Sequence, residues 1–156
     1  MSFMCYNKYK GDKMEFNNAI QVLPWLYLCG EKQVEGILNK IDTWIDFRNE
    51  LSTNLEIKAP DNVVVIKIPF IDGDLEKAKK VYPTAKLILD RTKLNNQKVL
   101  VSCHKGLSRS ALIALWCMAE EMGYEKAYNK MKLINSELNI DIRFLPIIEQ
   151  IKMMYK

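Results

Sequence analysis

Apolar and polar residues alternate in short blocks along this chain of 156 residues. Runs of mostly branched apolar residues at 63–68 (VVVIKI) and 98–102 (KVLVS) predict strands that are covered on both faces. Residues 19–29 (AIQVLPWLYLC) predict two short strands separated at Pro24, because proline donates no hydrogen bond to a sheet. Residues 41–47 (IDTWIDF) predict a further strand.

Helical spacing of apolar residues appears between these strands. Residues 31–40 predict a short helix, and residues 74–94 predict a longer one. We expect the longer helix to restart at Pro83, because proline is tolerated only in the first turn. Residues 108–123 predict a third helix, which directly follows the strand at 98–102. Two more helices are expected at about 125–137 and 142–154.

The order of these elements predicts an α/β fold with a central, mostly parallel sheet that is flanked by helices on both faces. Residues 1–16 show no apolar period, so we interpret them as an N-terminal tail or edge segment. Residues 17–156 contain no repeat, low-complexity segment or linker and are expected to form one domain.

Composition and charge narrow the possible partners. The sequence has 23 Lys and Arg against 19 Asp and Glu, a formal net charge of +4. This mild excess suits a small anionic substrate better than duplex nucleic acid, so no nucleic acid partner is expected.

No apolar stretch approaches the roughly 20 residues of a membrane span, and the start MSFMCYNKYKGDK lacks a signal-peptide core. We therefore expect no membrane association and a cytoplasmic location with reduced cysteines. The four cysteines are too scattered for a zinc site, so no metal is expected.

The segment 101–110 (VSCHKGLSRS) joins a predicted buried strand to the start of a predicted helix. The first backbone N–H groups of a helix have no intrahelical partner, and the helix dipole adds positive charge, so such a place binds phosphate. Gly106 allows several amides to turn inward, and Arg109 can bind two phosphate oxygens at once. The same features favour the thiolate form of Cys103, which is a nucleophile aimed at phosphorus. The alternative is that Cys103 is simply a buried structural cysteine.

Residues 103–110 match the C-x5-R-[ST] signature loop of cysteine-dependent protein tyrosine phosphatases, and their Arg-Ser ending resembles the dual-specificity branch. The resemblance covers about residues 19–155. It includes the segments VLPWLYLCG, IDTWIDFRNE, IPFIDGDLEKAKKVY and FLPIIEQI. It implies a cysteine-phosphatase-like α/β fold and hydrolysis of phosphotyrosine, phosphoserine and phosphothreonine in a protein substrate, with no metal or other cofactor.

The resemblance also implies a role for each matching residue. Cys103 would attack phosphorus and form a cysteinyl-phosphate intermediate. Ser110 would hydrogen-bond the thiolate and assist breakdown of the intermediate, while Asp72 would act as general acid and later activate water. Arg109 would bind the phosphoryl oxygens and stabilise the transition state, which makes it a catalytic residue as well. The substrate phosphate would be bound along the loop by His104, Lys105, Gly106, Leu107, Ser108 and Arg109.

Two carboxylates compete for the role of general acid. The Pro-x-x-Asp spacing of the family fits Pro69 and Asp72. Asp74 is instead well placed to cap the following helix, because Asp is among the preferred N-cap residues. We therefore assign the general acid to Asp72.

The sequence departs from the family pattern at two places. The family usually has histidine immediately before its cysteine, where this chain has Ser102; the only histidine, His104, follows the cysteine instead. His104 either reaches the rim of the pocket or points into solvent. The Arg and Pro-Asn that are usual before the last helix are also missing, so either Asn139 or Asp141 is expected to brace the loop.

Other functions fit the same loop. One is a phosphatase of a phosphoinositide, an RNA 5′ end or a phosphorylated carbohydrate. Another is a weakly active phospho-binding module, although the presence of Cys103, Arg109 and Asp72 together argues against it. Cys29 and Cys117 lie in apolar settings and are expected in the core, with a resolving role for Cys29 towards oxidised Cys103 as the alternative. The sequence does not determine the oligomeric state.

Overall fold

A computed structural model describes residues 19–49 and 56–156, so the expected N-terminal segment 1–16 lies outside the described residues. Its strands are β1 (Ile20–Leu23), β2 (Leu26–Gly30), β3 (Thr43–Asp46), β4 (Val64–Lys67) and β5 (Val99–Cys103). Its α-helices are α1 (Leu75–Leu94), α2 (Arg109–Met122), α3 (Tyr124–Ile134) and α4 (Leu145–Met154). Three short 3₁₀ helices are η1 (Glu31–Gln33), η2 (Leu38–Lys40) and η3 (Ile142–Phe144). Across these two ranges, no helix is both long enough and apolar enough to span a bilayer.

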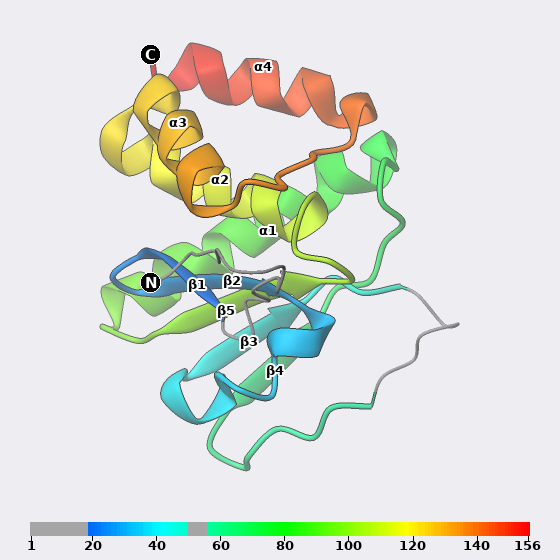
Figure 1. The fold of residues 1–156 in the computed structure, drawn as a ribbon, viewed down its shortest axis with the longest axis vertical. Helices are drawn as coiled ribbons and strands as arrows, with labels where there is room; N and C mark the ends of the chain where they lie inside the picture. The colour runs from blue at the N-terminus through cyan, green and yellow to red at the C-terminus, as the bar shows by residue number, and fades with distance from the viewer. Residues whose placement is uncertain (1–18, 50–55) are drawn as a thin grey trace, which may run out of the picture.

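The strands form one five-stranded sheet in the order β1-β2-β5-β3-β4 (Figure 1). Only the β1–β2 pair is antiparallel; the other three pairs are parallel. The register pairs Gly30 with Cys103 and Asp46 with Ser102, so the carboxyl ends of β2, β5 and β3 meet at one edge of the sheet. In open α/β sheets this edge is where ligands bind. The predicted α/β fold with a mostly parallel sheet is confirmed.

The two apolar runs differ in their place in the sheet. All residues of β5 are buried between β2 and β3, as predicted. Residues 63–68 form a strand, β4, as predicted, but the expectation that it is covered on both faces was wrong, because β4 is an edge strand and Val64 is 57% exposed. A branched apolar run fits either position, and only pairing with a distant segment decides which one it takes.

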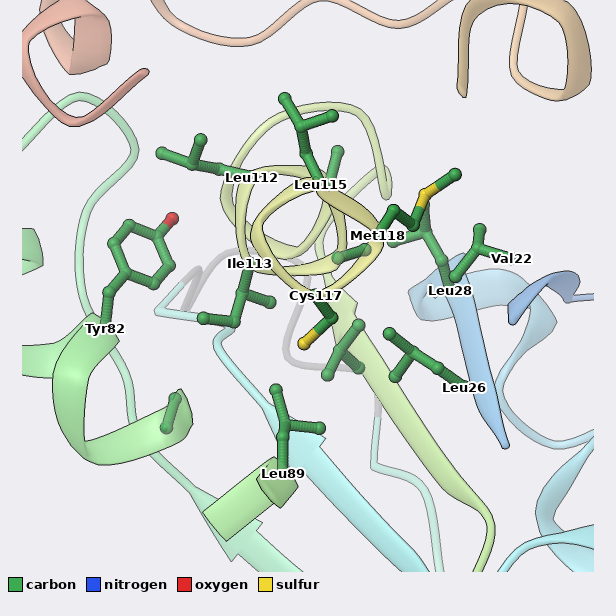
Figure 2. Packing of buried hydrophobic residues seen from close by; sticks show 14 of the residues in the cluster. Val22, Leu26, Leu28, Tyr82, Leu89, Leu112, Ile113, Leu115, Cys117 and Met118 are labelled. Carbon is green, nitrogen blue, oxygen red and sulfur yellow. The ribbon is translucent and has the colours of Figure 1, made fainter. Parts of the chain in front are cut away.

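The main hydrophobic core lies between the sheet and the four α-helices, which Figure 1 shows stacked on one side of the strands. Helix α2 runs through the middle of this core, and in Figure 2 it is seen nearly end-on with labelled side chains all around it. Leu26 and Leu28 reach it from the sheet, and Tyr82 and Leu89 reach it from α1. Because α2 is enclosed on nearly every side, its N-terminus is held firmly beside the end of β5.

The second face of the sheet is covered by a smaller cluster around Trp44. Val34, Ile37 and Leu38 supply much of it, as their spacing suggested. The segment 31–40 nevertheless forms two 3₁₀ helices rather than one α-helix. Gly36 lies in its middle, and glycine disfavours a helix by about 1 kcal/mol relative to alanine. Helices therefore do lie on both faces, but those on the second face are short 3₁₀ turns.

Helix α1 continues through Pro83, so the predicted restart was wrong. Proline removes one backbone hydrogen bond from the helix interior. Pro83 lies on the exposed side of α1, where water can hydrogen-bond the carbonyl that has lost its partner, while Tyr82 and Ala85 pack into the core. The other predicted helices are confirmed, and Gly123 ends α2 with a φ of 88°.

Candidate active site

Cys103 ends β5, and its side chain is the centre of a loop that leads into α2. The residue is only 2% exposed. The backbone N–H of Gly106 donates to Sγ of Cys103 at 3.3 Å, and Oγ of Ser110 lies 3.1 Å from the same sulfur. The sulfur therefore lies beside the N-terminus of α2, where backbone N–H groups and the helix dipole favour negative charge. Ser110 has the contact that its expected role requires.

The loop is packed directly on the end of β2. Gly106 has a φ of 78°, and a Cβ there would lie 2.6 Å from the carbonyl carbon of Cys29. A Cβ on Gly30 would lie 2.7 Å from the backbone of Lys105. The backbone N–H of Glu31 also donates to the carbonyl of His104 at 3.0 Å. Two glycines therefore allow the loop and β2 to approach backbone to backbone, which fixes the position of the loop amides.

Arg109 is buried and its guanidinium is oriented by the main chain. Nη1 donates to the carbonyl oxygens of Phe47, at 3.2 Å, and Phe70, at 2.7 Å. The hydroxyl of Tyr82 donates to the carbonyl of Arg109 at 2.7 Å. The rings of Phe47, Phe70, Tyr82 and Phe144 pack against one another with centroids 5.6–6.4 Å apart. This aromatic cluster, which the sequence did not reveal, joins the segments that hold Arg109.

The two competing carboxylates have different partners. Oδ1 of Asp72 accepts a hydrogen bond of 2.7 Å from the hydroxyl of Ser108, so Asp72 lies at the loop of residues 103–109. Asp74 is the N-cap of α1, and its side chain accepts from the backbone N–H of Lys77 at 3.1 Å. The prediction that Asp74 caps the helix is confirmed.

Ser108 occupies the N-cap position of α2, but its hydroxyl makes no capping bond to the helix. It donates to Asp72 and accepts from the backbone N–H of Asp141 at 2.9 Å. This serine therefore joins three segments: the loop, the segment before α1 and the segment before α4.

Ser102 and His104 have neighbours other than the sulfur of Cys103. The hydroxyl of Ser102 accepts a hydrogen bond of 2.8 Å from the indole N–H of Trp44, on the opposite face of β5. Nδ1 of His104 lies 3.1 Å from a carboxylate oxygen of Glu31, without the alignment of a hydrogen bond. The contact becomes an ion pair when the imidazole is protonated. A direct role of His104 in phosphate binding stays a prediction.

The segment between α3 and α4 braces the loop through its backbone. The N–H of Asn139 donates to the carbonyl of Leu107 at 3.1 Å, and that of Asp141 donates to Ser108. Both candidates for the bracing role therefore contribute. The side-chain amide of Asn135 adds a 3.4 Å bond to the carbonyl of Gly106, which no sequence pattern indicated.

Lys105 and Leu107 form the outer part of the loop. Lys105 is exposed and Leu107 is half-buried. The expected roles of Lys105 and Leu107 in substrate binding stay predictions.

Cys29 and Cys117 are buried in the core, as expected. Burial raises the pKa of the Cys29 thiol well above its ordinary value, and the neighbouring Cys103 and Asp46 raise it further. Because Cys29 pairs in register with Ser102, its side chain points to the face of the sheet opposite to Cys103. This arrangement does not favour a disulfide between Cys29 and Cys103. Among the residues with described positions, no three His, Cys, Asp or Glu side chains gather as a metal site.

Comparison with known proteins gives one family. The sequence profile "Dual specificity phosphatase, catalytic domain" matches residues 26–152. Dual specificity protein phosphatase 8 of Mus musculus is 30% identical over 131 residues. These residues make up 80% of this chain but only 19% of that relative, so the chain spans about a fifth of the relative's length.

Two crystal structures have the same fold. The structure of DUSP15 is similar with a TM-score of 0.73 and 21% identity, covering 87% of this chain and 88% of that one. The human tyrosine phosphatase-like serine/threonine/tyrosine-interacting protein is similar with a TM-score of 0.71 and 19% identity, covering 89% and 98% of the two chains.

Proposed function

This chain belongs to the dual specificity phosphatase family, and on that premise we propose that it hydrolyses phosphotyrosine, phosphoserine and phosphothreonine in proteins without a metal ion. The observation that carries the proposal is the environment of the Cys103 sulfur. It lies 3.3 Å from the amide nitrogen of Gly106 and 3.1 Å from the Ser110 hydroxyl, beside the N-terminus of α2. A thiolate there is stabilised by backbone dipoles and faces the place where a phosphate binds.

In the first step the Cys103 thiolate attacks phosphorus. An S–P bond forms while the P–O bond to the leaving group breaks, and the carboxylic acid of Asp72 gives its proton to the leaving oxygen. The loop amides and the guanidinium of Arg109 stabilise the negative charge on the three remaining phosphoryl oxygens. The carbonyls of Phe47 and Phe70 fix one nitrogen of Arg109, which orients the whole guanidinium plane.

In the second step water attacks the phosphocysteine. The carboxylate of Asp72 accepts a proton from this water, the S–P bond breaks, and inorganic phosphate leaves. Ser110 donates its hydroxyl proton in a hydrogen bond to the departing thiolate. Each charge that develops is met by a group of this chain, so the proposed reaction needs no metal.

The proposed range of substrates rests on the segments that surround the loop. The short segments 68–74 and 135–141 contact the loop at Leu107, Ser108 and Arg109, and the loop residue Lys105 is exposed. Short walls admit the shorter side chains of phosphoserine and phosphothreonine as well as phosphotyrosine. The exposed lysine also suits an anionic substrate.

Turnover of an aryl phosphate and of phosphopeptides tests the proposal. Cys103→Ser should abolish turnover but retain tungstate binding, because an alkoxide is far harder to form than a thiolate. Cys117→Ser is the matched control, since Cys117 lies in the core away from the loop. EDTA should have no effect on the wild-type rate.

Three results would contradict this function. Residual Cys103→Ser activity above about a hundredth of wild type would place the nucleophile elsewhere. Tungstate binding without any wild-type hydrolysis would indicate a phospho-binding module. Hydrolysis of inositol phosphates or phosphorylated carbohydrate in preference to phosphopeptides would indicate a non-protein substrate.

A further inference from the structure

Arg143 lies in η3 and extends over the segment that carries Asp72. Its Nε and Nη2 donate to the two carboxylate oxygens of Asp141 at 2.9 and 2.7 Å. Its backbone N–H also donates to Asp141 at 2.9 Å. These bonds hold the pKa of the Asp141 carboxyl below its usual range, so the pair is ionised on both sides. From this fixed position Nη2 reaches the main-chain carbonyl of Asp72 at 3.4 Å.

The residue after Asp72 accommodates the guanidinium. Gly73 is buried and has a φ of 89°, a conformation that favours glycine. The space that a side chain of Gly73 would occupy is filled by the Cζ, Nη2 and Nε atoms of Arg143. The planar guanidinium therefore covers the main chain at Gly73 while it binds Asp141, a combination that the ammonium of a lysine could not reproduce.

Asp141 connects this arrangement to the loop of residues 103–109, which is proposed to bind the phosphate and is called the phosphate loop below. Its backbone N–H donates to the hydroxyl of Ser108, and this hydroxyl in turn donates to the carboxylate of Asp72. Asp72 is thus held twice: through its side chain by Ser108, and through its main chain by Arg143. Both interactions involve Asp141, which contacts Ser108 through its backbone and Arg143 through its carboxylate.

We propose that Arg143 is a positioning residue that holds the segment 70–74 against the phosphate loop, so that the carboxyl group of Asp72 stays within reach of the leaving oxygen. The inference rests on the proposed function, because it gives Arg143 a part in the same reaction. Two nitrogens of Arg143 are already bound by Asp141, which neutralises its charge. Arg143 therefore acts through Asp72 and not as a phosphate-binding group.

A series of aryl phosphates with leaving groups of different acidity separates these roles. Arg143→Gln should lower kcat/KM about two- to fivefold on phenyl phosphate, the range expected for an exposed ion pair. It should leave hydrolysis of esters of strongly acidic phenols unchanged, because these leave without a proton. Arg91→Gln, an exposed arginine in the last turn of α1, is the matched control and should change neither. In an Asp72→Asn background, Arg143→Gln should cause no further loss.

Hydrogen exchange reports the order of the segment 70–74 and does not depend on turnover. The N–H of Asp74 donates to the carbonyl of Ile71 at 3.0 Å, so exchange in a peptide covering residues 70–75 reports its order. Exchange should become faster in Arg143→Gln and stay unchanged in Arg91→Gln. Unchanged exchange in Arg143→Gln would overturn the inference, as would an equal loss on all aryl phosphates. If wild type shows no turnover that depends on Cys103, the proposed function fails, while the exchange result still decides whether Arg143 holds the segment.

Discussion

The backbone contact between the phosphate loop and β2 is tested by adding one methyl group at each of three glycines. Gly106→Ala places a Cβ 2.6 Å from the Cys29 backbone at a residue whose φ is 78°. Gly30→Ala places one 2.7 Å from the Lys105 backbone, but with an ordinary φ of −89°. Gly123→Ala has a φ of 88°, but its Cβ would meet nothing closer than 3.6 Å. The three variants therefore separate steric overlap from backbone strain.

The expected magnitudes follow from these geometries. Gly123→Ala carries strain alone and should lower the free energy of unfolding by about 1–3 kcal/mol. Gly30→Ala carries overlap alone, and extra atoms in a well-packed site cost about 1–3 kcal/mol. Gly106→Ala carries both and should cost about 2–5 kcal/mol. Since backbone atoms supply the overlap, no side chain can relieve it by changing rotamer.

Urea unfolding measures stability, and the rate of hydrolysis of an aryl phosphate reports whether the loop holds its catalytic groups in position. Gly30→Ala and Gly106→Ala should each lose turnover by more than about tenfold, because displacing catalytic groups by about 1 Å can cost a factor near 10². Gly123→Ala should keep wild-type turnover while it remains folded. Wild-type turnover in Gly30→Ala would show that the loop does not depend on its contact with β2.

Four further substitutions have defined outcomes. Asp72→Asn should slow hydrolysis of esters with poor leaving groups by roughly 10²- to 10⁴-fold, and hydrolysis of acidic aryl esters much less. Asp74→Asn should lower the free energy of unfolding by about 1 kcal/mol and change activity little. If steady-state kinetics show the larger loss in Asp74→Asn, the two roles are exchanged. Ser102→Ala should lower stability by about 1–3 kcal/mol, because it leaves the buried Trp44 N–H without its acceptor, yet the pH profile of thiol alkylation at the nucleophile should not move. Burial raises the pKa of Cys117 to about 12, so the neutral thiol stabilises the fold below pH 9 and this contribution is lost as pH rises from about 9 to 12. In urea titrations, the free energy of unfolding of Cys117→Ala should fall less steeply with alkaline pH than that of wild type. An equal fall in the two proteins would contradict the contribution of the neutral Cys117 thiol to stability.

Local patterns predicted most of the fold. Pro24 separates β1 from β2, the run at 98–102 is a fully buried strand, and Gly123 ends α2. The errors arose where tertiary structure decides. The run at 63–68 has the composition of a central strand, but its place at the edge depends on pairing with β3 alone. Pro83 is tolerated within α1 because it lies on the exposed side.

The residues of the candidate site were likewise predicted only in part. The signature loop and Asp72 lie in continuous segments, so the resemblance of these segments to the family was sufficient to indicate them. Arg143, Asn135 and the aromatic cluster of Phe47, Phe70, Tyr82 and Phe144 come from segments far apart in the chain. Their contacts depend on how α3, η3 and α1 pack around α2, which no periodic pattern encodes. The one local signal was Gly73 directly after Asp72, a residue small enough to let another side chain cover the main chain.

Trapping the phosphorylated enzyme tests the central claim most directly. Asp72→Asn, mixed with an aryl phosphate of an acidic phenol and quenched in acid, should accumulate the intermediate, because this leaving group departs unaided while attack by water lacks its base. Mass spectrometry of the digested protein should find one phosphoryl group on the peptide that contains Cys103, and none in Cys103→Ser. Release of the phenol with no phosphorylated peptide, or a phosphoryl group on another residue, would contradict catalysis by this cysteine.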